Sequence, residues 1–226
     1  MAGKTQSKGK CFFCEKDYTK SGMSKHLKAC KDRKDAMDKA KGKKKEINLH
    51  HLVVSDAYSK DYWLHLEMNG DAVLEVLDRY LRAIWLECCG HLSDFLEPTG
   101  RGEELSMDER IDDVFGPGRK LRHIYDWGTS SETMIECVDV RRGLPLTKHA
   151  IFLMSRNAMP VEKCAECDKP AIFYCTGCLA EEGEWTPLCE KHAKTHECVE
   201  DYEPGTIYNS PRMGMCGYDG PAEPPY

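Results

Sequence analysis

The stretch DYWLHLEMNGDAVLEVLDRYLRAIWLECCG, residues 61–90, decides the fold class because its hydrophobic period changes along its length. In the first part, residues 61–68, apolar and polar side chains alternate. Such alternation predicts a β-strand with one face buried and the other in water. The face that we expect to be buried carries Tyr62, Leu64, Leu66 and Met68.

The second part, residues 71–89, has the period of an α-helix. Its apolar residues follow one another at helical spacing: Val73, Leu77, Leu81, Ile84 and Cys88. That spacing places them on one side of an amphipathic helix. Asn69 or Asp71 can cap its first turn, and Gly90 marks its end. A strand followed directly by such a helix predicts an α+β domain.

Three further strands are predicted on the carboxyl side of this helix. They are RKLRHIYDW (119–127), TMIECVDV (133–140) and HAIFLMSRN (149–157). GTSS has the composition of a turn between the first two strands, and RRGLPLT can serve as a loop between the last two. We therefore expect an antiparallel sheet with one principal helix against it.

The composition is that of a soluble protein. The 226 residues are 41% hydrophobic and 31% charged, which allows one core domain plus smaller modules. AIFLM at 150–154 is among the longest apolar runs, and a membrane helix needs roughly 20 such residues. MAGKTQSKGK at the amino terminus lacks the apolar segment of a secretory signal. We expect a cytoplasmic protein whose thirteen cysteines stay reduced, so that paired thiols indicate metal rather than disulfides.

Charge divides the chain into a basic arm and an acidic body. Residues 1–45 carry 15 Lys and Arg against 5 Asp and Glu, a net charge of +10, and the remainder carries 17 against 33, a net charge of −16. Four segments are predicted. They are a basic arm with a zinc finger at 1–45, an α+β domain at 46–160, a cross-braced double zinc module at 161–200, and an extended tail rich in Pro, Gly and Tyr at 201–226.

The arm contains CFFCEKDYTKSGMSKHLKAC, which has the ligand spacing of a zinc finger. The expected ligands are Cys11, Cys14, His26 and Cys30. Two thiolates at this spacing suit a tight turn that aims both sulfurs at one ion. His26 and Cys30 stand at positions i and i+4, on one face of a helix, so the four groups can close a tetrahedron.

The helix of the finger is expected to begin at Ser21 as N-cap, with Met23 and Leu27 as a small apolar stripe against Tyr18. The segment resembles the Cys2His2 finger family in its Cys-Cys-His-Cys variant. Tyr18 and Met23 stand near the places of that family's core aromatic residue and leucine. The loop is one residue shorter than in the family, and Cys30 takes the last ligand position.

Beyond Cys30 the sequence KDRKDAMDKAKGKKK keeps helix-forming residues and then becomes a lysine run. A basic finger with a basic tail predicts an anchor to nucleic acid, RNA included, or to the ribosome through phosphate contacts. A single finger rarely reads sequence, so anchoring is favoured over reading. The candidate contacts are Lys20, Lys25, Lys28, Lys31, Arg33, Lys34, Lys43, Lys44 and Lys45. The alternative is a solvated tail beside a purely structural finger.

Six cysteines and two histidines lie within CAECDKPAIFYCTGCLAEEGEWTPLCEKHAKTHEC, residues 164–198. Eight ligands suffice for two zinc ions. The spacing resembles B-box-type and other cross-braced modules, in which the first and third ligand pairs share one ion and the second and fourth share the other. The resemblance implies one site made of Cys164, Cys167, Cys189 and His192. It implies a second made of Cys175, Cys178, His196 and Cys198.

The last ligand of the second site stays open, because a single residue separates His196 from Cys198, and Cys216 in RMGMCGYDG competes for the place. With the finger, the chain is expected to bind about three zinc ions. Closed, thiolate-rich sites with four ligands indicate structural rather than catalytic zinc. The predicted α+β domain is thus flanked by small zinc-binding modules. The likeness to B-box modules implies contacts with proteins.

Two stretches of the middle domain, LRAIWLECCGHLSDF (81–95) and HIYDWGTSSETMIECV (123–138), resemble the plasmid pRiA-type ORF-three family. This family is also met as the TnpR-like proteins of an insertion element. In it a helix ending near Cys-Gly-His-Leu precedes a strand ending in Tyr-Asp-Phe-Gly, and Tyr125, Asp126, Trp127 and Gly128 take that place here. The resemblance covers about half of the chain. It implies an α+β fold and no particular activity.

An enzymatic role for the middle domain is the least favoured hypothesis. His91, Asp94, Asp126 and Glu132 can supply a polar cluster, and Cys88 with Cys89 a nucleophile. The sequence contains no phosphate-binding loop, dinucleotide glycine pattern, nucleophile elbow or H-E-x-x-H motif. We interpret Cys88 as a small core residue on the helix, His91 as a hydrogen-bonding residue at its end, and Asp126 as a turn residue.

Two non-enzymatic hypotheses remain. In the first, a multi-zinc protein is anchored to nucleic acid or a ribonucleoprotein through residues 1–45, and its acidic body contacts proteins. In the second, the chain is a protein–protein adaptor that does not bind nucleic acid. Salt-sensitive binding that depends on the basic arm distinguishes the two.

Overall fold

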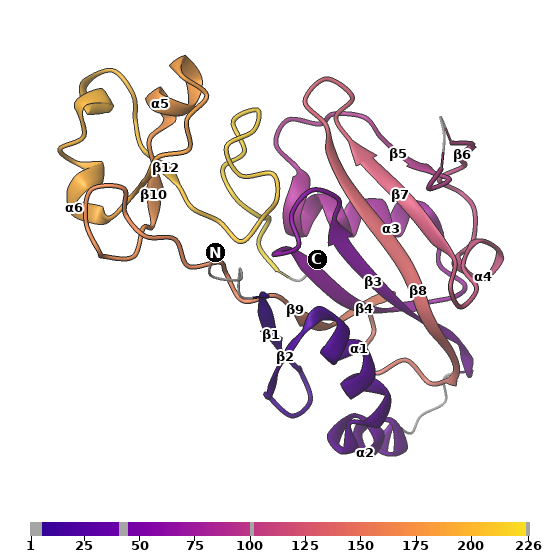
Figure 1. The fold of residues 1–226 in the computed structure, drawn as a ribbon. Coiled ribbons are helices and arrows are strands. Elements are labelled where there is room, and N and C mark those ends of the chain that lie inside the picture. Colours follow the sequence, from indigo (N-terminus) through magenta and orange to yellow (C-terminus); the bar gives the residue numbers. More distant parts are fainter. Residues whose placement is uncertain (1–5, 41–44, 100–101, 225–226) are drawn as a thin grey trace. The chain divides into compact units, whose positions relative to one another are not determined.

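The computed structural model describes residues 6–40, 45–99 and 102–224 of the chain. They form two compact units (Figure 1). The first unit comprises Met1–Arg82 and His91–Ala158, and the second comprises Ala83–Gly90 and Met159–Tyr226. The basic arm therefore belongs to the same unit as the sheet. The carboxyl-terminal tail shares a unit with the cysteine-rich module and with a short segment from the middle of the chain.

A seven-stranded antiparallel sheet forms the centre of the first unit, with strand order β6-β5-β7-β8-β3-β4-β9. The strands are β3 (Ile47–Asp56), β4 (Trp63–Asn69), β5 (Ser93–Leu96), β6 (Glu104–Leu105), β7 (Lys120–Tyr125), β8 (Ser131–Gly143) and β9 (Ile151–Arg156). A separate two-stranded sheet joins β1 (Lys8–Lys10) to β2 (Asp17–Thr19). The helices are α1 (Lys20–Ala29), α2 (Lys31–Lys39), α3 (Leu74–Leu81) and α4 (Ile111–Val114), and a π-helical turn η1 (Arg82–Leu86) follows α3.

This arrangement confirms the predicted α+β class with an antiparallel sheet. The three strands expected after the helix correspond to β7, β8 and β9. The long strand β3 was not predicted, although β4 and β8 pair with it on its two sides. Its sequence INLHHLVVSD places two histidines in the middle of an otherwise apolar run. Both histidines are buried, and both are hydrogen-bonded. Because their polar atoms have partners, β3 can occupy a central place in the sheet.

Strand β4 differs from the half-buried strand that the alternation predicts. Leu64, Leu66 and Met68 are buried as expected, whereas Tyr62, predicted on the same face, is only partly buried because it precedes the strand. The intervening residues Trp63, His65 and Glu67 are buried as well. The second face is covered because the finger packs on it. Polar residues on that face are satisfied by polar groups of the finger rather than by water.

The predicted helix is real but shorter than expected, and neither Asn69 nor Asp71 caps it. Its N-cap is Val73, which makes no side-chain capping bond. Asn69 instead ends β4, and the chain turns at Gly70, where an added Cβ would lie 2.1 Å from Asp112 Oδ1. The buried carboxylate of Asp78 fixes α3 to the sheet, because His123 on β7 bonds to it at 2.8 Å.

In the described residues of the second unit, three short strands form an antiparallel sheet in the order β11-β10-β12. They are β10 (Phe173–Tyr174), β11 (Pro187–Leu188) and β12 (Gly205–Thr206). The helical elements are α5 (Thr176–Glu181), α6 (Glu190–Ala193) and the 3-10 turn η2 (Glu197–Glu200). The tail was expected to be extended, yet it adds β12 to this sheet and buries Ile207, Ser210, Arg212 and Tyr218.

Candidate metal centres

The four predicted ligands of the finger come together. One ligand atom from each of Cys11, Cys14, His26 and Cys30 lies within 4.8 Å of all the others. Cys14 Sγ is 3.2 Å from His26 Nε2. Burial raises the pKa of Cys11 to about 11, so this thiol needs a nearby cation to become a thiolate. The group can hold a metal ion and has the donor set of a zinc site.

The local structure of the finger explains this geometry. The turn after β1 closes with the Cys11 amide donating to the Lys16 carbonyl at 3.0 Å, which directs the first two thiols to one point. Helix α1 is capped by Thr19 rather than by the predicted Ser21, and the Thr19 hydroxyl accepts a hydrogen bond from the Gly22 amide at 3.3 Å. Cys30 ends α1 and begins α2, so the last ligand is also the joint between the two helices.

The apolar side of the finger packs on the sheet. Met23 and Leu27, the predicted stripe, are buried with Trp63 of β4 and Met154 of β9. Phe12 meets Phe152 of β9 edge to face, with ring centroids 4.8 Å apart. Each Å² of apolar surface that these contacts remove from water contributes about 25 cal/mol to stability. The contacts with the sheet therefore stabilise the finger in addition to any bound metal.

A buried chain of polar groups also joins the finger to the sheet. His51 of β3 lies 2.9 Å from His65 of β4, whose other ring nitrogen lies 3.1 Å from the Lys20 carbonyl of α1. Burial lowers the pKa of His51 to about 2 and that of His65 to about 4, so both rings are neutral at pH 7.

Arg33 was predicted to contact nucleic acid, but its guanidinium is buried. It donates to the Leu27 carbonyl at 3.0 Å and to Glu67 Oε2 at 2.8 Å. Glu67 also accepts two hydrogen bonds from Arg141 of β8, at 2.9 and 2.6 Å. Both carboxylate oxygens of Glu67 thus accept hydrogen bonds, and its ion pair with Arg33 holds α2 on the sheet. Because the Arg33 guanidinium is buried in this pair, we exclude Arg33 from the candidate contacts with nucleic acid.

The other candidate contacts differ in exposure. Lys25, Lys28, Lys31, Lys34 and Lys45 are exposed. Lys20 is partly buried, and burial lowers its pKa. Lys28 lies 3.9 Å from Asp139 and donates to the Val138 carbonyl. Lys43 and Lys44 lie outside the described residues.

In the second unit, the first predicted site of the double module comes together as Cys164, Cys167, Cys189 and His192. Cys164 Sγ lies 3.2 Å from His192 Nδ1, and Cys167 Sγ lies 3.8 Å from Cys189 Sγ. The other ring nitrogen of His192 lies 3.9 Å from Glu166 Oε2, which is beyond hydrogen-bond distance. Burial raises the pKa of Cys164, but hydrogen bonds from the Cys189 backbone and from His192 outweigh it and lower the pKa to about 6.

The second site comprises Cys175, Cys178, His196 and Cys198, which leaves Cys216 outside it. Cys175 is the N-cap of α5, and its sulfur accepts from the Cys178 amide at 3.3 Å. Cys178 Sγ lies 3.8 Å from Cys198 Sγ. Gly177 is required between the first two ligands, because an added Cβ would lie 2.9 Å from Cys198 Cβ and 2.8 Å from the Tyr202 ring. A hydrogen bond with Cys175 raises the pKa of Cys198 to about 12, so without a metal the Cys198 thiol keeps its proton. A bound cation would displace the protons of these thiols.

A fourth group was not foreseen. Within the second unit, the sulfurs of Cys88, Cys89 and Cys216 also lie within 4.8 Å of one another. Cys88 was interpreted as a core residue of the helix, but the helical turn ends at Leu86 and Cys88 is only partly buried. No local spacing could reveal the group, since Cys216 stands 127 residues after Cys89. All thirteen cysteines lie in the described part of the chain, and none forms a disulfide.

The proposed catalytic cluster is only partly assembled. His91 Nε2 lies 3.4 Å from Asp126 Oδ2. Asp94 instead accepts from Trp127 Nε1, and Glu132 accepts from the Tyr58 hydroxyl. Asp126 has a φ of 63° and accepts from the amides of Gly128 and Thr129. Its role as a turn residue is confirmed.

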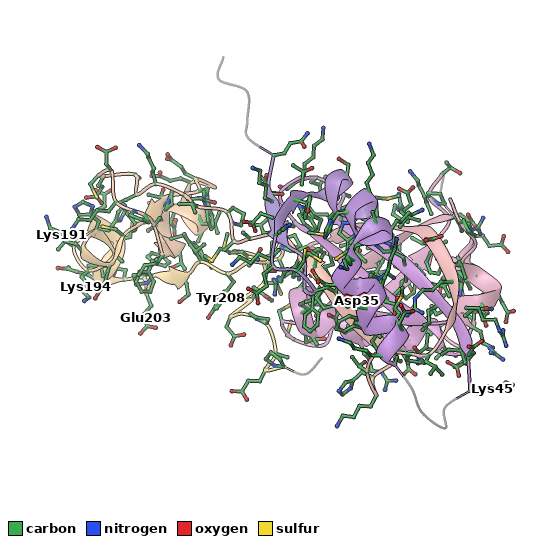
Figure 2. All side chains as sticks on the ribbon, turned by 90° about the horizontal axis from the view of Figure 1, so that it is seen from below. Asp35, Lys45, Lys191, Lys194, Glu203 and Tyr208 are labelled. Carbon is green, nitrogen blue, oxygen red and sulfur yellow. The ribbon has the colours of Figure 1, made fainter. Side chains whose placement is uncertain are left out.

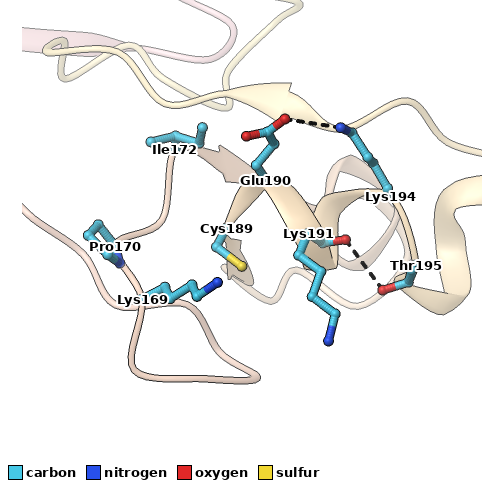
Figure 3. Close-up of a pocket in the computed structure, with 8 residues that line it drawn as sticks. All are labelled: Lys169, Pro170, Ile172, Cys189, Glu190, Lys191, Lys194 and Thr195. Carbon is cyan, nitrogen blue, oxygen red and sulfur yellow. Dashed lines mark hydrogen bonds and ion pairs between the residues drawn. The ribbon is translucent and has the colours of Figure 1, made fainter.

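A groove of about 640 Å³ lies beside the first site of the double module (Figure 3). Its lining combines the apolar side chains of Pro170 and Ile172 with lysines from two segments. The lining residues are Lys169, Pro170, Ile172, Cys189, Glu190, Lys191, Lys194 and Thr195. Lys191 and Lys194 project at the edge of the second unit (Figure 2), and Lys194 pairs with Glu190 at 3.0 Å.

No protein-family model matches the chain, and no curated protein matches it. A crystal structure of a protein of unknown function from Methanosarcina mazei Go1 is similar, with 14% sequence identity and a TM-score of 0.39, over 46% of this chain and 66% of that chain. Among the described residues, no helix combines the length and the apolar character that crossing a membrane requires.

Proposed function

We propose that the chain is a non-enzymatic, cytoplasmic multi-zinc protein that anchors to nucleic acid or to a ribonucleoprotein such as the ribosome through its amino-terminal finger. The acidic remainder contacts protein partners. The observation that carries the proposal is the orientation of the finger, which turns its apolar side to the sheet and leaves a set of lysines in water. The proposal also includes the two resemblances seen in the sequence. The middle domain of the chain is related to the plasmid ORF-three family, and its carboxyl-terminal module is of the B-box type.

Zinc as the bound metal is supported by sulfur spacing. With Zn–S bonds of about 2.3 Å, two sulfurs of a tetrahedral site lie roughly 3.8 Å apart. The pairs Cys167–Cys189 and Cys178–Cys198 are both separated by 3.8 Å. Three thiolates and one imidazole leave no open position, so the predicted three ions serve structure. A chain whose thirteen cysteines form no disulfide suits a reducing compartment.

Phosphate binding is supported by the exposed side of α1 and α2. Lys25, Lys31 and Lys34 are exposed there, whereas Met23 and Leu27 are buried against the sheet. Acidic residues alternate with the lysines on α2, so the contact is made by individual lysines rather than by a uniform positive surface. Such contacts neutralise phosphates without reading bases, as expected for an anchor.

The test is the binding of full-length protein to labelled single-stranded RNA and duplex DNA over a series of salt concentrations. The variant carries Lys25→Glu, Lys31→Glu and Lys34→Glu, and the matched control carries Lys169→Glu, Lys191→Glu and Lys194→Glu, which changes the net charge by the same amount. We expect affinity of the first variant to fall about tenfold or more and its salt dependence to weaken, since each lost phosphate contact reduces the slope by about 0.9 for duplex DNA. Equal losses in both variants would contradict the proposal.

A protein–protein adaptor is the second candidate, and the groove in Figure 3 favours it. Apolar lining beside Lys169 and Lys191 suits an acidic peptide with an apolar side chain. A full complement of zinc without RNA or DNA binding at low salt would favour this adaptor over the anchor.

A further inference from the structure

Three thiols that belong to neither of the expected sites of the double module gather in the second unit. Cys88 Sγ lies 3.7 Å from Cys89 Sγ, and Cys89 Sγ lies 3.8 Å from Cys216 Sγ. These separations match the edge of roughly 3.8 Å between sulfurs of a tetrahedral zinc site. They are much longer than a disulfide bond of about 2.05 Å. The three sulfurs are therefore spaced as ligands rather than as a bonded pair.

The backbone around these cysteines contains several residues with positive φ, a conformation that is unfavourable for residues other than glycine. Cys216 has a φ of 47°, in the left-handed region, and lies between Gly214 and Gly217, which also have positive φ. A residue other than glycine is strained in this conformation. Gly90, with a φ of 78°, turns the chain directly after Cys89. Strain of this kind is concentrated at binding sites.

Hydrogen bonds hold the two contributing segments together within the second unit. The Ser210 hydroxyl donates to the Trp85 carbonyl at 2.6 Å, and the Ala222 amide donates to the Ala83 carbonyl at 2.8 Å. The buried guanidinium of Arg212 lies 3.5 Å from Cys88 Sγ. A cation at this distance favours the thiolate, which is the form that binds metal.

The chain offers His91 as a fourth donor, because this residue follows Cys89 by only two positions along the sequence. A carboxylate lies beside this ring, since His91 Nε2 is 3.4 Å from Asp126 Oδ2. The resulting donor set, three sulfurs and one nitrogen, is the same as in each of the other three groups.

We propose that the thiolates of Cys88, Cys89 and Cys216 hold a fourth zinc ion within the second unit, which fastens the carboxyl-terminal tail to the Ala83–Gly90 segment. Binding replaces the protons of the thiols, which pass to solvent. Cys89 and Cys216 are exposed, so this ion is reached by chelators more easily than the ions of the other groups, each of which contains at least two buried cysteines. The site is independent of nucleic-acid binding, and its failure leaves the proposed function untouched.

The test is the metal content of the full-length protein, purified with thiol reductant and zinc and measured by native mass spectrometry. We expect four zinc ions in the wild type and three in each of two variants, Cys89→Ser and Cys216→Asn. Asparagine tolerates the left-handed backbone, so Cys216→Asn removes the ligand without disturbing the loop. Cys137→Ala, a buried cysteine outside all four groups, is the matched control and retains four ions.

A second measurement uses a competing chelator on the same proteins. In the wild type and in the control, one ion is released before the others, and in both variants that early release is missing. Three ions in the wild type would overturn the proposal, as would an unchanged ion count in both variants. A Cys88–Cys89 or Cys89–Cys216 disulfide found in the reductant-treated protein would also overturn it.

Discussion

The amino-terminal finger and the carboxyl-terminal double module use the same donor set, but they differ in what else holds them. The finger places its apolar stripe on Trp63 and Met154 and ties α2 to the sheet through the buried ion pair of Arg33 with Glu67. The double module has two small clusters of buried residues, and one of them consists largely of the ligands themselves. A bound metal would thus be one of several stabilising terms in the finger and the principal one in the module.

Metal removal gives the largest difference between the two regions. We expect a strong chelator, added with reductant to the full-length protein, to unfold residues 163–206 while the strands of the large sheet stay protected. Structural zinc contributes on the order of 10 kcal/mol per site, more than the small core of the module supplies. Hydrogen exchange measured by mass spectrometry, with and without metal, checks this. Equal exchange in both regions would show that the finger depends on zinc as much as the module does.

The buried ion pair of the finger gives a smaller effect. Arg33→Met is expected to lower the free energy of unfolding of the first unit by about 2–3 kcal/mol, because Glu67 loses one partner but keeps Arg141. The exposed neighbour provides the control, since Lys34→Met should change stability by less than about 0.5 kcal/mol. Urea unfolding followed by tryptophan fluorescence measures both. Identical midpoints for the two variants would mean that the ion pair does not fasten the finger.

The histidine chain beneath the finger predicts a pH dependence. The folded pKa values, about 2 for His51 and about 4 for His65, lie below the ordinary value of 6.5. Below pH 6.5 the unfolded chain therefore binds protons that the folded chain does not, and stability falls as the pH decreases toward the folded values. Between pH 6.5 and 5.5 the loss is about 1 kcal/mol for each histidine.

The variant His51→Gln isolates this effect, because glutamine can still donate to His65 but does not titrate. Zinc ligands also take up protons in acid, so the informative quantity is the difference between the slopes of stability against pH for wild type and variant. A shallower slope for the variant supports the buried neutral histidines. Parallel slopes would show that His51 has the same pKa in the folded and in the unfolded chain.

The spacing of metal ligands within one segment could be predicted from the sequence, but helix caps, the strand β3 and contacts between distant segments could not. The spacing of Cys11, Cys14, His26 and Cys30 acts within one turn and one helix, so it predicts a group that the structure brings together. The second face of β4 is buried by a finger some forty residues earlier in the chain, and alternation along one strand carries no information about it. Arg33 lies in a basic segment, which is why it was predicted to contact phosphate. Only the folded structure shows that it is paired with Glu67 instead.

The discontinuity of the second unit has a consequence for biosynthesis. Trp85 leaves the ribosome long before Ser210, which stands 125 residues later and whose hydroxyl bonds to the Trp85 carbonyl. At about 5–20 residues per second, the Ala83–Gly90 segment waits on the order of 10 s for the tail that completes its surroundings. During this interval the Trp85 carbonyl lacks the Ser210 hydroxyl that bonds to it in the complete fold.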